Sequence, residues 1–156
     1  MENETTPQQK TQQTVEEMLI AQREKWTQDI NNLNASMANL VKIDEMMNSI
    51  YAKRQEAIDY YYAMNGVILK QSKEYKALYN QMFNNIKING YNGMRFTSDQ
   101  SISRQVEVDL QDKKEVIDLL VSQNAFIKET ISTIDNIIYA IKDKIKIKEM
   151  LNGMKF

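Results

Sequence analysis

The chain has 156 residues, a formal net charge of −1, and no cysteine or histidine. The absence of cysteine excludes disulfides and thiolate nucleophiles, and the absence of histidine removes the usual general base and a common zinc ligand. The adjacent carboxylates Glu16–Glu17 and Asp44–Glu45 point to different sides of a helix, and Asn89–Gly93 lacks the Lys-Ser/Thr of a phosphate-binding loop. We therefore expect no enzymatic activity, no cofactor and no metal site.

Hydropathy and charge indicate where the protein acts. No apolar run is long enough to cross a bilayer and no signal-peptide pattern is present, so we expect a soluble cytoplasmic protein with no membrane partner. The near-neutral net charge argues against nucleic-acid binding by the chain as a whole. The charges are unevenly placed, however, because residues 1–24 are mainly acidic and residues 141–156 are mainly basic.

The N-terminal half predicts a tail followed by one long helix. Residues 1–13 carry too few apolar side chains to offset the entropy of ordering, which predicts a disordered tail. Thr14 and Glu17 fit a capping box that opens a helix. Apolar residues then keep to one face, which drifts by one position after Leu40, and we predict a single helix from Thr14 to about Ala63.

The middle of the chain is less regular. Asn65-Gly66 either ends the long helix or only interrupts it, and helical spacing resumes up to residue 86. Residues 87–108 contain two Asn-Gly steps, which predict a loop or a small β-hairpin. Within this segment, residues 106–108 alternate like a short strand.

A C-terminal helix is predicted over residues 109–151, with a heptad ladder of isoleucine and leucine that continues to Lys148. A lone helix cannot bury this stripe, so it packs against the N-terminal half, against copies of the chain, or against both. Isoleucine at both core positions favours more than two strands, and we predict a homo-oligomer. The predicted oligomerisation residues are Ile117, Leu120, Asn124, Ile127, Ile131, Ile134, Ile138, Ile141 and Ile145.

Two polar features have alternative interpretations. Asn124 in the ladder either fixes register and oligomer order as a buried amide, or faces solvent where the helix enters the bundle. Tyr60–Tyr62 follow the basic pair Lys53-Arg54, an arrangement that suits stacking on unpaired bases. Successive helical residues point about 100° apart, however, which favours packing of these tyrosines in a core or an interface.

The basic C-terminal end also has two interpretations. In a monomer, Lys142, Lys144 and Lys148 would form a solvated helix end that complements the helix dipole. In a ring of several copies, the same charges would multiply into a basic collar. Such a collar could bind a phosphate backbone even though each chain is nearly neutral.

Two stretches carry a family resemblance. One runs from Asp109-Leu110-Gln111-Asp112-Lys113-Lys114-Glu115-Val116 through the isoleucine ladder to Ala140–Lys148 and Phe156, and the other is Ala57-Ile58-Asp59-Tyr60-Tyr61. Together they resemble the UvsY-like family of phage recombination mediators, the second stretch matching the Tyr-Tyr segment at the end of its first long helix. The resemblance covers roughly residues 37–65 and 103–156.

This resemblance implies a non-catalytic, ring-forming homo-oligomer that binds single-stranded DNA. It implies a role in DNA recombination and repair, in which the protein helps load a RecA-like recombinase onto strands covered by single-strand-binding protein, in an infected bacterial host cell. By resemblance, Lys142, Lys144 and Lys148 correspond to the family's basic C-terminal segment. Lys53 and Arg54 lie near its basic first-helix segment, which makes these five the expected nucleic-acid-binding residues.

The predicted architecture is therefore all-α and forms a single domain after the tail. It consists of a long N-terminal helical arm (14–86), an irregular middle segment (87–108) and a C-terminal coiled-coil-type oligomerisation helix (109–151). The alternative function is that of a coiled-coil structural, scaffold or virion interaction protein that does not bind nucleic acid.

Overall fold

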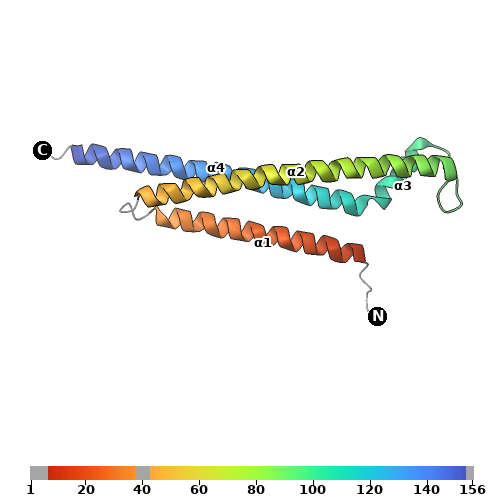
Figure 1. Cartoon of the computed structure of the whole chain (residues 1–156), viewed down its shortest axis with the longest axis horizontal. Helices are drawn as coiled ribbons and strands as arrows, with labels where there is room; N and C mark the ends of the chain where they lie inside the picture. The colour runs from red at the N-terminus through yellow and green to blue at the C-terminus, as the bar shows by residue number, and fades with distance from the viewer. Residues whose placement is uncertain (1–6, 38–42, 154–156) are drawn as a thin grey trace. The chain divides into compact units, whose positions relative to one another are not determined.

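The computed structural model describes residues 7–37 and 43–153, and within them the chain forms four helices (Figure 1). They are α1 (Pro7–Ser36), α2 (Ile43–Asn89), α3 (Asp99–Asp109) and α4 (Gln111–Gly153). The predicted all-α class is confirmed. Residues 1–6, 38–42 and 154–156 lie outside the described residues, and with them Phe156 of the family resemblance.

The single helix predicted from Thr14 to Ala63 is wrong. Its sequence forms α1, which begins earlier, at Pro7, and ends at Ser36, and the start of α2 at Ile43. The drift of the apolar face near Leu40 therefore coincides with a break between two helices. The break has a physical reason, because Trp26 of α1 and Ile50 of α2 are buried in the same core, and one straight helix could not place both there.

The Asn65-Gly66 step does not end α2, which continues without interruption to Asn89. The helix beyond it matches the resumed helical spacing that the sequence predicts. At the other end of the chain, α4 spans Gln111–Gly153, close to the helix predicted over residues 109–151.

The chain divides into two compact units. Unit 1 takes in the chain up to Met18 together with Met64–Ser122, and unit 2 consists of Leu19–Ala63 and the chain from Gln123 onward. Helices α1, α2 and α4 each contribute one stretch to each unit. Each unit is described separately below.

Unit 2 is a three-helix assembly of residues 19–36 of α1, 43–63 of α2 and 123–153 of α4. Its core is rich in isoleucine because the ladder of α4 is covered by apolar faces of α1 and α2. The buried core residues are Trp26, Ile30, Met46, Ile50, Ala57, Ile127, Ile134, Ile137, Ile138 and Ile141.

Unit 1 has a smaller core around the turn between α2 and α3. Its buried residues are Ile86, Ile102, Val106 and Leu110, and aromatic side chains pack against them. The strand expected at residues 106–108 is wrong, since this segment lies in α3, where Val106 is fully buried. Ser98 caps α3 by accepting a hydrogen bond from the backbone N–H of Ser101.

The predicted Asn-Gly turn occurs at Asn92-Gly93, but only one pair of residues bridges across it. Tyr91 and Met94 exchange backbone hydrogen bonds of 2.8 and 2.9 Å, and Asn92 and Gly93 both have positive φ, as a two-residue hairpin turn requires. Gly90 also has a positive φ of 79°, and a Cβ there would lie 2.5 Å from the Met94 carbonyl oxygen. Glycine is therefore required at position 90.

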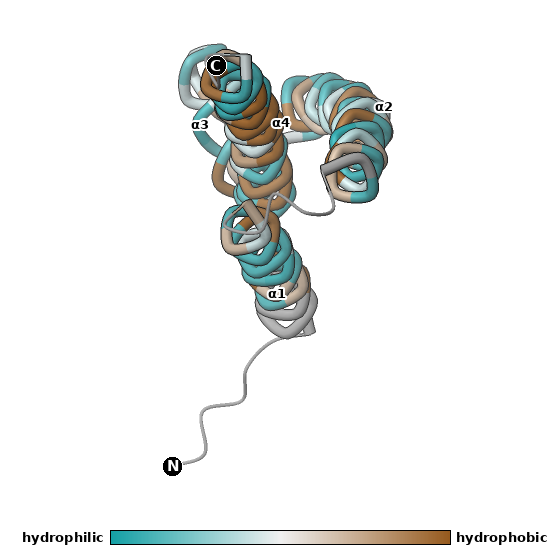
Figure 2. Tube along the Cα trace, turned by 90° about the vertical axis from the view of Figure 1, so that its left-hand side faces the viewer, coloured by the Kyte–Doolittle hydropathy of each residue, from teal (hydrophilic) through white to brown (hydrophobic). Residues whose placement is uncertain are grey.

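Hydropathy differs between the helices. In Figure 2, α1 is mainly hydrophilic, whereas α4 carries many more hydrophobic residues. Even so, none of the helices in the described ranges is long and apolar enough to span a membrane.

Candidate nucleic-acid interface

All five basic residues that the sequence singles out lie in unit 2. Lys53 and Arg54 lie on α2, and Lys142, Lys144 and Lys148 lie near the end of α4. Because neighbouring residues on a helix point about 100° apart, Lys53 and Arg54 reach different partner helices. The structure brings Arg54 close to α4 and places Lys53 against α1.

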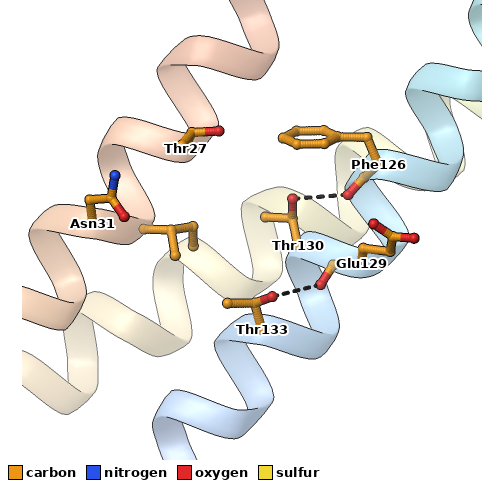
Figure 3. A pocket seen from close by; sticks show the side chains of 7 residues that line it. Thr27, Asn31, Phe126, Glu129, Thr130 and Thr133 are labelled. Carbon is orange, nitrogen blue, oxygen red and sulfur yellow. Dashed lines mark hydrogen bonds between the residues drawn. The ribbon is translucent and has the colours of Figure 1, made fainter.

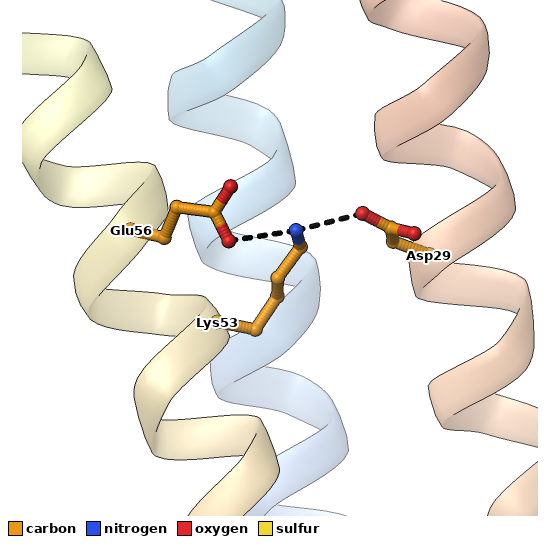
Figure 4. Close-up of polar contacts among 3 residues, drawn as sticks. All are labelled: Asp29, Lys53 and Glu56. Carbon is orange, nitrogen blue, oxygen red and sulfur yellow. Dashed lines mark hydrogen bonds and ion pairs between the residues drawn. The ribbon is translucent and has the colours of Figure 1, made fainter.

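Lys53 is held in a contact between α2 and α1 (Figure 4). Its Nζ lies 2.7 Å from both Asp29 Oδ2 and Glu56 Oε2, and 4.4 Å from the centroid of the Trp26 ring. The Lys53 side chain is only 17% exposed. Burial alone lowers the pKa of Lys53, but the hydrogen bonds to Asp29 and Glu56 outweigh it, and the net result is a raised pKa. The contacts of this lysine give it a role within the chain.

Arg54 joins α2 to α4. Its Nε donates to Asp135 Oδ1 at 2.6 Å, and its Nη2 lies 3.4 Å from Asp135 Oδ2. The hydrogen bond to Asp135 is the main cause of the raised pKa of Arg54, and Tyr139 adds a smaller electrostatic contribution. The guanidinium side chain remains 37% exposed, so the pair lies at the surface and one side of Arg54 faces solvent.

The Arg54–Asp135 pair also shows how far α4 extends past α2. The two helices run antiparallel within unit 2 (Figure 1). Helix α2 begins at Ile43, eleven residues before Arg54. Because the two helices are antiparallel, Ile43 lies level with Lys146, which is eleven residues after Asp135. The last turns of α4 therefore extend beyond the first residue of α2, and Lys142, Lys144, Lys146 and Lys148 are all exposed.

Most of the predicted oligomerisation residues in unit 2 are buried by the chain's own helices. Ile127, Ile134, Ile138 and Ile141 belong to the core, and Ile131 and Ile145 pack against it half-buried. In unit 1, Leu120 is buried and Ile117 is half-buried. Asn124 is also buried, which removes the interpretation that it faces solvent.

The tyrosine cluster divides between core and surface. Tyr60 donates a hydrogen bond to Gln22 and lies 6.4 Å from Trp26 between ring centroids, and Tyr61 packs against the core. Packing within the chain thus accounts for Tyr60 and Tyr61. Tyr62 is 69% exposed.

Sequence reasoning missed two exposed tyrosines of unit 2. Tyr139 is 65% exposed and its ring centroid is 6.0 Å from Lys142 Nζ, and Tyr51 is 45% exposed on α2. Lys146 was also missed. The available signal was spacing, because Tyr139, Lys142 and Lys146 recur at steps of three and four and so share one face of α4.

A hollow of about 180 Å³ lies between α1 and α4 (Figure 3). It is lined by Thr27, Ile30, Asn31, Phe126, Glu129, Thr130 and Thr133. The two threonine hydroxyls of α4 donate to main-chain oxygens one turn earlier, Thr130 to Phe126 and Thr133 to Glu129. The hydroxyl protons of both threonines are therefore already used within the helix. Over the described ranges, no cluster of acidic side chains could hold a metal ion.

Comparisons of the chain with protein-family models, curated proteins and solved structures found no match. Evidence about function therefore comes from the geometry of unit 2. Its most distinctive surface is the end of α4, where exposed lysines and an exposed tyrosine lie together.

Proposed function

We propose that the protein is a homo-oligomeric recombination mediator that binds single-stranded DNA and helps load a RecA-like recombinase onto strands covered by single-strand-binding protein. The observation that carries this proposal is the exposed basic end of α4. The family resemblance of the same segment supports the loading role. The proposed nucleic-acid contacts are Lys142, Lys144 and Lys148, together with the neighbouring Lys146.

The charge at this end of α4 suits a phosphate backbone. Residues 142–149 carry four lysines against Asp143 and Glu149, a net charge of +2 in a chain whose overall charge is −1. Each phosphate that a lysine neutralises releases counterions, so affinity should fall steeply as salt rises. A single chain offers few such contacts, and several copies would multiply them.

Self-association is proposed through the uncovered part of α4. Since α1 and α2 already cover much of the isoleucine ladder, a second copy needs other apolar surface. Ile147, Met150 and Leu151 provide it, with exposed fractions of 57%, 62% and 61%. They are spaced three and four residues apart and so lie on one side of the helix. Burying them between copies would remove apolar surface from water.

The first experiment measures binding of labelled oligo-dT by fluorescence anisotropy over a range of salt concentrations. We expect binding at micromolar protein or tighter in low salt, and loss of binding in the Lys142→Glu/Lys144→Glu/Lys148→Glu variant. The matched control reverses Lys70, Lys73 and Lys76, three exposed lysines of unit 1, and thus makes the same change in net charge. Equal loss in both variants would show that only net charge matters and would reject the α4 site.

A second experiment tests self-association by sedimentation. Leu151→Asp places a charge in the proposed contact and should lower the mass of the assembly without lowering helix content. Leu69→Asp is the control, since Leu69 is 62% exposed and lies in unit 1. A wild-type mass for Leu151→Asp would reject this contact.

A structural or scaffold protein without nucleic-acid binding is the second candidate function. It is favoured by the ion pairs of Lys53 and Arg54, which engage two of the expected DNA contacts within the chain. Absence of oligo-dT binding at low salt would select this function over the first.

A further inference from the structure

Two exposed tyrosines lie close to the ion pair that Arg54 of α2 forms with Asp135 of α4. Tyr51 lies three residues before Arg54 on α2, and Tyr139 lies four residues after Asp135 on α4. Residues three and four apart share a helix face, so each tyrosine lies on the same side of its helix as its ion-pair residue. Both rings are exposed, 45% for Tyr51 and 65% for Tyr139.

The antiparallel course of the helices brings both tyrosines to one side of the ion pair. Moving three residues back along α2 covers about 4.5 Å, and moving four residues forward along α4 covers about 6 Å in the same direction. Tyr139 is close enough to Arg54 to contribute to its electrostatic environment. Beyond Tyr139, Lys142 lies 6.0 Å from its ring, and Lys146 follows one turn later.

Exposed tyrosine rings beside basic side chains suit the binding of an unpaired nucleic-acid strand. Single-stranded nucleic acid offers flat base faces and a row of phosphates, and proteins bind it with exposed aromatic rings beside cations. In a duplex the base faces are already stacked on one another, so protein aromatic rings cannot readily stack on them. The aromatic–basic surface of Tyr51, Arg54, Tyr139, Lys142 and Lys146 provides both kinds of contact.

We propose that Tyr51 and Tyr139 stack on unpaired bases while Arg54, Lys142 and Lys146 contact the neighbouring phosphates, so that this surface selects single-stranded over double-stranded nucleic acid. The inference rests on the proposed function and adds to it the source of strand selectivity. It also separates these tyrosines from Tyr60 and Tyr61, whose rings pack within the chain.

The test compares three labelled probes of equal length: oligo-dT, an abasic strand that keeps only the sugar–phosphate backbone, and a duplex. We expect the wild-type protein to bind oligo-dT more tightly than the abasic strand or the duplex. Tyr51→Ala/Tyr139→Ala should weaken oligo-dT binding by about tenfold or more while leaving abasic binding unchanged. Tyr51→Phe/Tyr139→Phe keeps both rings and should bind as the wild type does.

Tyr62→Ala is the matched control, because Tyr62 is exposed on α2 but lies outside the proposed surface. Fluorescence of Trp26, which is only 6% exposed in the core of unit 2, reports whether each variant is folded. If the double alanine variant unfolds, the pair Tyr139→Leu and Tyr139→Phe replaces it. Tyr139→Leu should then weaken oligo-dT binding and Tyr139→Phe should not.

The possible failures are distinguishable. Equal wild-type affinity for oligo-dT and the abasic strand, or unchanged oligo-dT binding in the folded variant that lacks the ring at position 139, overturns the stacking inference and leaves the proposed function standing. Absence of binding to any probe overturns both. An equal loss in Tyr62→Ala would assign the effect to general aromatic content and overturn the specific surface.

Discussion

The two units bury different kinds of side chain. Unit 2 encloses isoleucines from α2 and α4, residues far apart in the sequence, among them Ile50, Ile127 and Ile134, each with an exposed fraction of 0%. Unit 1 buries a smaller aliphatic group at positions 86–110, and tyrosine and phenylalanine rings pack against it. The core contacts of unit 2 thus join distant segments, whereas those of unit 1 join neighbours in sequence.

This difference indicates which structural features the stability of each unit depends on. Contacts between distant segments must overcome the entropy of closing long loops, and unit 2 does so with fully buried branched aliphatic side chains. Unit 1 needs less loop closure but requires a tight reversal of the chain after α2. The conformations of Gly90, Asn92 and Gly93 provide that reversal. Changes to the core should therefore matter most in unit 2, and changes to the turn should matter most in unit 1.

The largest effect is expected from Ile134→Ala in unit 2. Removing a fully buried isoleucine side chain leaves a cavity and should lower the free energy of unfolding by about 2–5 kcal/mol. Urea denaturation followed by Trp26 fluorescence measures this, since Trp26 is the only tryptophan and lies in the same core. The control is Ile20→Ala, at a 48% exposed position of the same unit, with an expected change within about 0.5 kcal/mol. Equal effects would contradict the burial of the ladder within the chain.

Gly90→Ala should produce the next largest effect, in unit 1. A Cβ at a φ of 79° is strained and lies 2.5 Å from the Met94 carbonyl oxygen, so we expect a loss of about 1–3 kcal/mol. Hydrogen exchange of the amides of α3 would measure it. The control, Gly66→Ala, places a methyl group in open space within α2 and should stabilise that helix by about 0.5–1 kcal/mol. Destabilisation of similar size in both variants would argue against the turn as the cause.

Lys53→Met tests the polar contact between α1 and α2. It retains most of the aliphatic chain but removes the ion pairs with Asp29 and Glu56 and the cation above Trp26. We expect a loss of about 1–2 kcal/mol in unit 2, measured through Trp26 fluorescence. Lys73→Met, at an exposed position of unit 1, is the control and should be close to neutral. A Lys53→Met protein as stable as the wild type would show that Lys53 adds no stability, and would favour a role for this lysine in nucleic-acid binding.

The smallest effect concerns alkaline pH. Folding raises the pKa of Lys53 above its ordinary value of 10.5, so its contribution is complete below about pH 10 and is lost as pH rises through the folded pKa. The stability difference between wild type and Lys53→Met should therefore shrink above that pH, by about 1 kcal/mol or less. Taking this difference removes any effect of pH that the two proteins share. A constant difference up to pH 11.5 would contradict the assignment.

The proposed nucleic-acid surface was predictable only in part. The lysines near the end of α4 stand out in the sequence because they are many and close together, and the structure leaves them exposed. The pair Lys53-Arg54 looks uniform in sequence, yet one residue contacts α1 and the other α4. Tyr139 is a single aromatic residue beside a heptad ladder, and nothing local to it shows that α1 and α2 leave it uncovered.

The sequence by itself determined part of the local structure of this protein. The isoleucine spacing predicts a helix close to the observed α4, and Asn92-Gly93 predicts a tight turn, because helical period and backbone freedom are properties of short segments. The tertiary structure decided the separation of α1 from α2, the helices that cover the ladder, and the side chains left exposed. These depend on which distant faces pack together, and a rotation of about 100° between adjacent residues is enough to send neighbours to different partners.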